Sequence, residues 1–65
     1  MSAEDPDFLM TPVEVAKRLR VSVAWVRDHC SRMHPRLPVV RVGDLLRFRA
    51  RDIDRWLDEQ ARRAQ

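Results

Sequence analysis

The chain has 65 residues, a net charge of +3 and a single cysteine, Cys30. A chain of this length forms one domain with a thin core, because a domain of about 60 residues buries only about 60% of its unfolded surface, and one cysteine cannot form an internal disulfide bond. Residues 1–8 are acidic and contain no apolar run, so we expect neither a secretory signal nor a membrane span, and a cytoplasmic location.

Positive charge is concentrated in the middle of the sequence. Residues 1–16 carry a net charge of −4, residues 17–51 carry +8 and residues 52–65 carry −1. All basic residues except Lys17 are arginine, whose planar guanidinium group suits phosphate groups and guanine edges. The central region is therefore the expected binding region.

A first helix is predicted over about residues 12–19, after a flexible acidic tail at residues 1–8. Thr11 can cap the helix, Pro12 suits its first position, and Glu14 completes a capping box. The expected apolar face consists of Val15, Ala16 and Leu19.

A second helix is predicted over about residues 23–33, capped by Ser22. Its expected buried stripe has the spacing i, i+4, i+7 and consists of Val26, Cys30 and Met33. Pro35 and Pro38 exclude its continuation, so residues 34–38 are expected to form a stiff connector.

The segment "VVRVGDLLRFR" predicts a β-hairpin with two possible registers. A two-residue loop, Gly43-Asp44, would pair Val42 with Leu45 and place Arg41 beside Leu46. A three-residue loop, Gly43-Asp44-Leu45, would pair Val42 with Leu46 and leave Leu45 exposed at the tip.

We favour the three-residue loop, because only that register separates the apolar from the charged side chains on opposite faces. One face would then pin the hairpin to the core through Val40, Val42, Leu46 and Phe48, and the other would carry Arg41, Arg47 and Arg49.

A last helix is predicted from about residue 50, with a buried stripe of Ile53, Trp56 and Leu57. The expected fold is mainly α with a small β-hairpin, in the order α-α-β-β-α. Its domain would span residues 9–60, and residues 61–65 would be a frayed end.

Two short helices joined by a tight turn are typical of a helix-turn-helix, whose second helix lies in the major groove of DNA. The hairpin would then be a wing that directs guanidinium groups at the DNA backbone or the minor groove.

The sequence also resembles a known family over residues 9–57, in the stretches "LMTPVEVAKRLRVSVAWVRDHC" and "LPVVRVGDLLRFRARDIDRWL". These stretches resemble the winged helix-turn-helix module of the excisionase family, which is related to the DNA-binding part of the mercury-resistance regulator superfamily. The matching features are Leu9-x-Thr11, Glu14-Val15-Ala16, Leu19, Val21-Ser22, Val26, Leu37-Pro38, Arg41-Val42-Gly43, Arg47-Phe48-Arg49 and Asp52-Ile53-x-x-Trp56-Leu57.

The resemblance implies a small, non-catalytic protein that binds repeated DNA sites cooperatively and bends DNA. Many members direct a phage or mobile-element integrase toward excision, and others regulate transcription. The sequence departs from the family in three places: Arg20 stands where Gly is frequent, the connector is about two residues longer, and the hairpin tip carries Asp44 and Leu45 in place of small or basic residues.

The predicted DNA contacts come from the second helix, its flanks and the hairpin. Arg27 is expected to touch DNA, and Arg20 and Arg32 to contact phosphates. Trp25 has two open interpretations, packing on the connector or exposure for contact with DNA or a partner. The predicted contact residues are Arg20, Ser22, Trp25, Arg27, Ser31, Arg32, Arg41, Arg47 and Arg49.

Two neighbours of these residues have alternative roles. Asp28 could accept a hydrogen bond from a cytosine amine. We favour one of two other roles, in which it pairs with Arg32 at i+4 or orients Arg27. Leu45 is either a plain loop residue or a contact between neighbouring copies along DNA.

Metal and catalytic sites are not expected. Zinc needs four ligands, and only His29, Cys30 and His34 lie close in sequence, with Cys30 on the buried stripe. No cofactor is predicted, and an enzyme is not expected. The expected partners are double-stranded DNA, a tyrosine or serine integrase and neighbouring copies of the chain, with no membrane.

Three functions fit these observations. The first is an architectural recombination factor of the excisionase type. The second is a small transcription regulator with the same module, and the third is a protein-interaction domain whose basic face meets an acidic partner.

Overall fold

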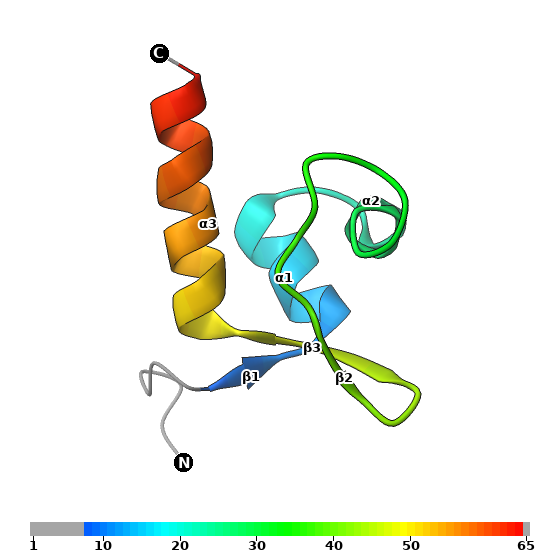
Figure 1. Cartoon of the computed structure of the whole chain (residues 1–65). Helices are drawn as coiled ribbons and strands as arrows, with labels where there is room; N and C mark the ends of the chain where they lie inside the picture. The colour runs from blue at the N-terminus through cyan, green and yellow to red at the C-terminus, as the bar shows by residue number, and fades with distance from the viewer. Residues whose placement is uncertain (1–7, 65) are drawn as a thin grey trace.

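The computed structural model describes residues 8–64 and packs three helices against a small antiparallel sheet (Figure 1). The elements in chain order are β1 (Leu9–Met10), α1 (Pro12–Leu19), α2 (Val23–Asp28), β2 (Val40–Val42), β3 (Leu45–Arg49) and α3 (Ala50–Arg63). This confirms the predicted winged helix-turn-helix class, mainly α with a hairpin. Strand β1 was not predicted.

Strand β3 is the centre of the sheet, whose order is β1-β3-β2. β1 pairs with the second half of β3, with Leu9 opposite Arg49 and Met10 opposite Phe48. Just before β1, the carbonyl of Phe8 accepts a hydrogen bond from the amide of Ala50 at 2.9 Å. The predicted acidic tail, residues 1–8, lies outside the described residues except for Phe8, which packs against the core.

Local signals decide the ends of α1. The amide of Glu14 donates to Thr11 Oγ1 at 3.2 Å and the amide of Thr11 donates to Glu14 Oε1 at 2.8 Å, so the predicted capping box is confirmed. α3 starts where predicted and continues to Arg63, so residues 61–63, which were expected to fray, are helical. Gln65 lies outside the described residues.

Helix α2 is shorter than predicted, because it ends at Asp28 and not near residue 33. The following amides of Ser31, Arg32 and Met33 all donate to the Asp28 carbonyl, which closes a turn in place of another helical turn. Since a residue that precedes a proline avoids the α conformation, the chain leaves the helix before Pro35. Met33 is therefore 47% exposed, and its predicted place on the buried stripe was wrong.

The hairpin has the two-residue loop, so the register that we favoured from the sequence was wrong. Val42 pairs with Leu45, Arg41 with Leu46, and Val40 with Arg47. Gly43 has a φ of 62° at the first loop position, which is where a type II′ hairpin turn takes glycine. Directly paired residues share a face of the sheet, and the predicted segregation of apolar and charged side chains is therefore absent.

The new register also changes which residues fasten the hairpin. Phe48 is fully buried and Leu46 packs against the core, as predicted. Val39 packs there in place of Val40, and Val42 is exposed. The hairpin tip can expose valine at little cost because it projects away from the helices (Figure 1).

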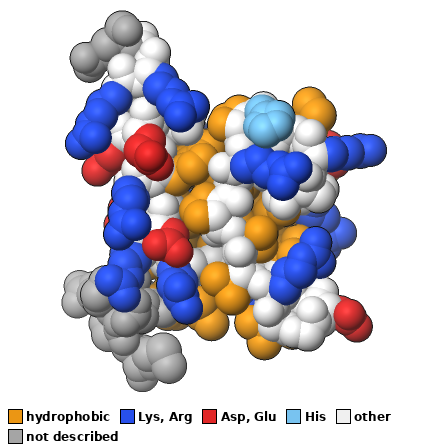
Figure 2. All heavy atoms as spheres, in the orientation of Figure 1, with side chains coloured by type: hydrophobic (Ala, Val, Ile, Leu, Met, Phe, Trp, Pro, Cys, Tyr) orange, Lys and Arg blue, Asp and Glu red, His pale blue; other side chains and the backbone are white. Residues whose placement is uncertain are grey.

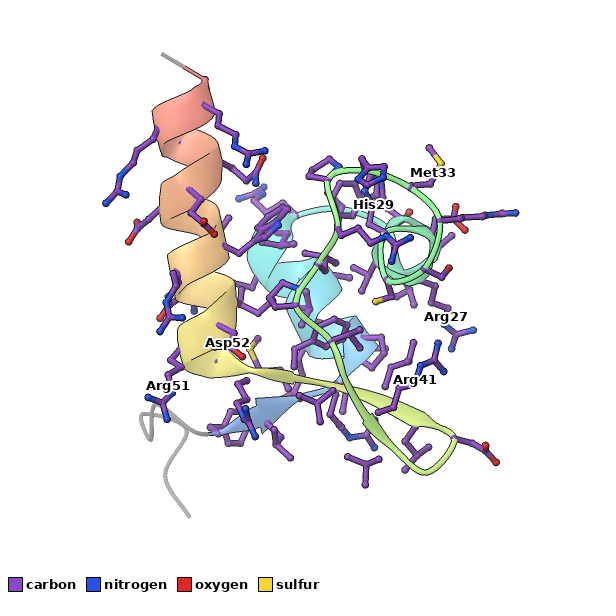
Figure 3. All side chains as sticks on the ribbon, in the orientation of Figure 1. Arg27, His29, Met33, Arg41, Arg51 and Asp52 are labelled. Carbon is purple, nitrogen blue, oxygen red and sulfur yellow. The ribbon has the colours of Figure 1, made fainter. Side chains whose placement is uncertain are left out.

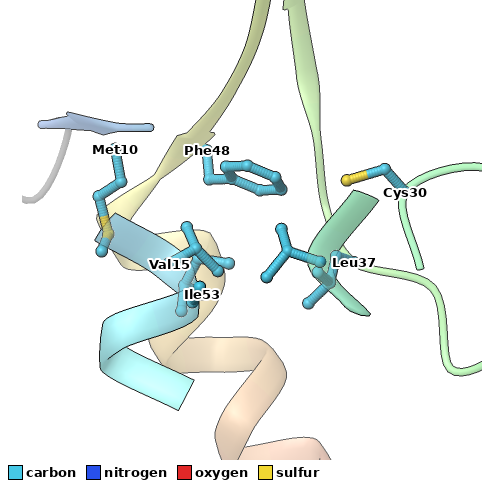
Figure 4. Close-up of a cluster of buried hydrophobic side chains, with 8 residues drawn as sticks. Met10, Val15, Cys30, Leu37, Phe48 and Ile53 are labelled. Carbon is cyan, nitrogen blue, oxygen red and sulfur yellow. The ribbon is translucent and has the colours of Figure 1, made fainter. Parts of the chain in front are cut away.

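The core lies between the sheet and the three helices (Figure 4). Phe48 from β3, Val15 from α1, Val26 from α2 and Ile53 from α3 are its fully buried large side chains. Helix α2 and strand β3 are therefore attached directly to one cluster, and β2 is joined to it through its pairing with β3. Among residues 8–64, the buried apolar residues are Met10, Val15, Ala16, Val26, Cys30, Leu37, Phe48 and Ile53.

Candidate nucleic-acid interface

Helix α2 is held at its start by the turn that joins it to α1. Arg20 ends α1 in the left-handed conformation, with φ 60° and ψ 46°, and its amide donates to the Ala16 and Lys17 carbonyls. Arginine pays a steric cost there that glycine would not. Ser22 then caps α2 by accepting a hydrogen bond from the Trp25 amide at 3.0 Å, as predicted.

A cleft opens between α2 and the β2–β3 hairpin. Arg27, which follows the buried Val26, is exposed on α2, and Arg41 reaches the same cleft from β2. Figure 3 shows both side chains extending to the same side of the molecule. The described residues provide neither guanidinium group with a hydrogen bond or an ion pair. The full lining is Pro12, Arg27, Cys30, Ser31, Arg41, Asp44, Leu45, Leu46 and Arg47.

Arg41 owes this position to the two-residue loop. In the register favoured from the sequence, Arg41 would share the outer face of the hairpin with Arg47, and that expectation was wrong. Arg41 instead shares the inner face with Leu46 and Phe48. Burial raises the pKa of the Cys30 thiol above its usual value, and the nearby Arg41 guanidinium group acts in the opposite direction.

Arg47 and Arg49 leave the opposite, outer face of the hairpin. Arg47 is half-buried, and its Nη1 donates to the Leu46 carbonyl at 2.7 Å, which brings the guanidinium group to the rim of the cleft. Arg49 pairs with Leu9 at the other end of β3 and does not line the cleft. The predicted arginine face is therefore divided between two sides of the sheet.

Trp25, for which the sequence left two interpretations open, is partly buried and packs against the core. Its ring stacks on His29 with a centroid distance of 3.7 Å and an interplanar angle of 14°. His29 is buried, and its Nδ1 lies 2.9 Å from the Pro35 carbonyl oxygen. His29 thus contacts the connector, and the Trp25 ring stacks on His29.

The remaining predicted contacts lie around α2 and are exposed. Arg32 Nη2 lies 3.4 Å from Asp28 Oδ1, which confirms the predicted i+4 pair. Ser31 lines the cleft, whereas Arg20, Ser22 and Arg32 do not. Four of the nine predicted contact residues therefore meet in one place, namely Arg27, Ser31, Arg41 and Arg47.

Positive charge is not confined to the cleft. In Figure 2, basic side chains lie over α2 and the hairpin and also along α3, with a band of apolar and backbone atoms between them. One basic side chain is neutralised across the core, since Arg18 on α1 pairs with Asp54 on α3. What distinguishes the cleft is therefore that Arg27 from α2 and Arg41 from β2 reach one place, and not positive charge alone.

Asp44 also lines the cleft, although from the sequence we considered it only as a loop residue and a departure from the family at the hairpin tip. Its signal was present in the two-residue loop Gly43-Asp44, which we set aside. An exposed apolar set on the outer sheet face was also missed, and it comprises Leu9, Val42 and Leu45.

Metal and membrane sites were also considered in the described part of the chain. Residues 8–64 contain no group of three or more His, Cys, Asp or Glu side chains that could hold a metal ion. Within the same residues, no helix has both the length and the apolar character needed to cross a membrane.

Comparison with known proteins gives one match. Residues 9–61 match the family described as a helix-turn-helix domain. No curated protein and no solved structure shows significant similarity to the chain. Helix-turn-helix domains place their second helix in the major groove of DNA and are typically not enzymes. Because the match covers most of the sequence, the chain belongs to the helix-turn-helix domain family, which indicates DNA as its partner.

Proposed function

We propose that the protein binds double-stranded DNA with α2 in the major groove and the hairpin beside the adjacent minor groove. The two grooves of B-DNA are separated by a ridge of phosphates. A protein that inserts a helix on one side of this ridge and a hairpin on the other must receive the ridge in the space between them. The cleft between α2 and the β2–β3 hairpin has this arrangement.

The observation that carries the proposal is the meeting of Arg27 and Arg41 in that cleft, where residues 8–64 offer neither side chain a hydrogen bond or an ion pair. Two like charges side by side repel each other, so a bound anion stabilises the arrangement. In the proposed complex Arg27 reads base edges from α2, and Arg41 contacts a backbone phosphate. Arg47, at the rim of the cleft, supports the phosphate contact of Arg41.

The other predicted contacts take secondary places in this proposal. Arg20 and Arg32 flank α2 in the chain, are exposed, and are proposed to contact neighbouring phosphates. Ser22 and Ser31 contribute hydroxyl groups at the two ends of the same region. Trp25 is left out because it stacks on His29, and Arg49 because it lies away from the cleft.

More finely, we propose a role of the excisionase type, in which the protein bends DNA to promote excision by a tyrosine or serine integrase. The resemblance over residues 9–57 and the family match over residues 9–61 support this role. A single module buries only about 600–1,000 Å² on DNA. Cooperative binding of neighbouring copies at repeated sites would supply the missing affinity.

Binding of a fluorescent 20-bp duplex, measured by anisotropy from 50 to 200 mM salt, tests the proposed DNA binding. Each neutralised phosphate contributes about −0.9 to the slope of log affinity against log salt, so four contacts predict a loss of about a hundredfold over this range. Absence of binding at 50 mM salt would instead favour the protein-interaction domain.

The finer role needs a second measurement on a duplex that contains repeated sites. An excisionase-type factor is expected to occupy the repeats in steps and to bend the DNA strongly, which gel mobility of circularly permuted probes reports. A single unbent complex would contradict this role and favour a transcription regulator.

A further inference from the structure

The geometry points to Asp44 as a specificity residue that reads the N2 amine of guanine in the minor groove. This inference rests on the proposed DNA binding and adds a base contact to it. Asp44 is the second residue of the hairpin loop, is exposed, and lines the same cleft as Arg27 and Arg41. It has no hydrogen bond or ion pair within residues 8–64.

The hairpin tip is the part of the protein that a minor groove can admit. The backbones of paired strands lie about 4.8 Å apart, so a two-stranded ribbon with its atoms is wider than the minor groove, which is about 6 Å wide and about 7.5 Å deep. Only side chains at the narrow end of the hairpin can therefore reach the base edges in this groove. A two-residue loop is the narrowest end that a hairpin can have, whereas α2 requires the wide major groove. With the phosphate ridge in the cleft, the tip therefore faces the minor groove.

Asp44 is the one polar side chain at this tip. Gly43 has no side chain, and space around it is open, with no atom within 4 Å of where a Cβ would lie. The pair that flanks the loop, Val42 and Leu45, is apolar and exposed. Any hydrogen bond between a side chain at the tip and a base edge must therefore be accepted by the carboxylate of Asp44.

A carboxylate can only accept hydrogen bonds, and the minor groove offers it one donor. A·T pairs present the acceptors adenine N3 and thymine O2, whereas G·C pairs add the guanine N2 amine. Asp44 is thus stabilised over a G·C pair and repelled by the acceptors of an A·T pair. The nearby phosphates add repulsion at every sequence, so the carboxylate gains specificity at a cost in affinity.

The decisive probes are 20-bp duplexes of alternating dG·dC and of alternating dI·dC. Inosine lacks the N2 amine of guanine and keeps the same major-groove edge, so the two duplexes differ in the minor groove. We expect wild-type protein to bind the dG·dC duplex about tenfold more tightly. Asp44→Ala should remove most of this preference and should bind the dI·dC duplex more tightly than wild type does.

Two controls separate the base contact from charge and folding. Asp44→Asn keeps a carbonyl acceptor and is expected to retain part of the preference while losing the negative charge. Since Asp44 is exposed and forms no hydrogen bond or ion pair with the described residues, far-UV circular dichroism should show both variants folded.

Three outcomes are distinguishable. The inference is supported if Asp44→Ala loses the dG·dC preference while wild type shows it and Asp44→Asn retains part of it. Equal wild-type affinity for both duplexes, or an unchanged preference in Asp44→Ala, overturns it while DNA binding itself stands. No binding of either duplex by wild type contradicts the proposed function, and the inference falls with it.

Discussion

The two sides of α2 differ in how their polar groups are satisfied. On the connector side, His29 Nδ1 lies 2.9 Å from the Pro35 carbonyl oxygen, the Leu37 amide donates to the His29 carbonyl, and Trp56 Nε1 donates to the Arg36 carbonyl. On the cleft side, the side chains of Arg27, Arg41 and Asp44 form no hydrogen bond or ion pair with the described residues. The connector side thus contributes stability, and the cleft side is available for a ligand.

The difference follows from the small size of the domain. A helix of six residues is too short to be stable alone, so α2 depends on tertiary contacts for its orientation. The connector supplies these contacts from behind and joins α2 to α3 through the Trp56–Arg36 hydrogen bond. The opposite face of α2 can then remain exposed and keep a fixed position relative to the hairpin.

Removing the shared core should unfold the connector side and the cleft side of α2 together, and this is the largest effect that we expect. Phe48→Ala deletes a fully buried ring and should lower the free energy of unfolding by about 3–5 kcal/mol. A single core of this size supplies little more than that, so the variant should be largely unfolded in urea titrations followed by far-UV circular dichroism. Leu45→Ala, in the same strand but 54% exposed, is the control and should change stability by less than about 0.5 kcal/mol.

A loss of less than about 1 kcal/mol for Phe48→Ala would show that the hairpin does not depend on this core. The idea that one core holds both sides of α2 in place would then be contradicted.

Arg41→Ala should affect the cleft side alone. We expect affinity for duplex DNA to fall about tenfold at every sequence, and the salt slope to become shallower by about 0.9, because one phosphate contact is lost. Stability should be nearly unchanged, since Arg41 is exposed and forms no hydrogen bond or ion pair with residues 8–64. Lys17→Ala removes the same charge from α1 outside the cleft and serves as the control. Equal losses for both variants would mean that net charge, and not the cleft, carries binding.

The smallest expected effect belongs to the connector side. Trp56→Phe keeps an aromatic ring and removes the Nε1 donor to the Arg36 carbonyl, so stability should fall by about 1 kcal/mol. Arg36→Ala keeps that backbone carbonyl and should leave the urea midpoint unchanged. A midpoint for Trp56→Phe equal to that of wild type would contradict a structural role for this bond.

Local features of the sequence were sufficient to predict α1 and α3. Thr11, Pro12 and Glu14 determine where α1 begins, because a capping box involves residues only three positions apart. The Ile53 stripe predicted α3, and Ile53 is fully buried. Arg27 was also predicted correctly as an exposed residue, since its position follows from the buried Val26 next to it.

The composition of the cleft was not predictable in the same way. Its residues depend on the hairpin register, and apolar alternation favoured a register that would have placed Arg41 on the outer face. The two-residue loop with Gly43 at positive φ decided otherwise. Alternation was a weak guide here because the hairpin tip projects from the core, where exposing Val42 costs little.

The sequence by itself therefore determined the helix-turn-helix class, the helix caps and the central positive charge, since these depend on neighbours along the chain. Only the tertiary structure decided that α2 stops at Asp28, that β1 joins β3, and that Arg41 and Asp44 meet Arg27 in one cleft. The physical reason is that strand pairing and loop geometry couple residues that are distant in sequence. A shift of one residue in their pairing moves every side chain to the other face.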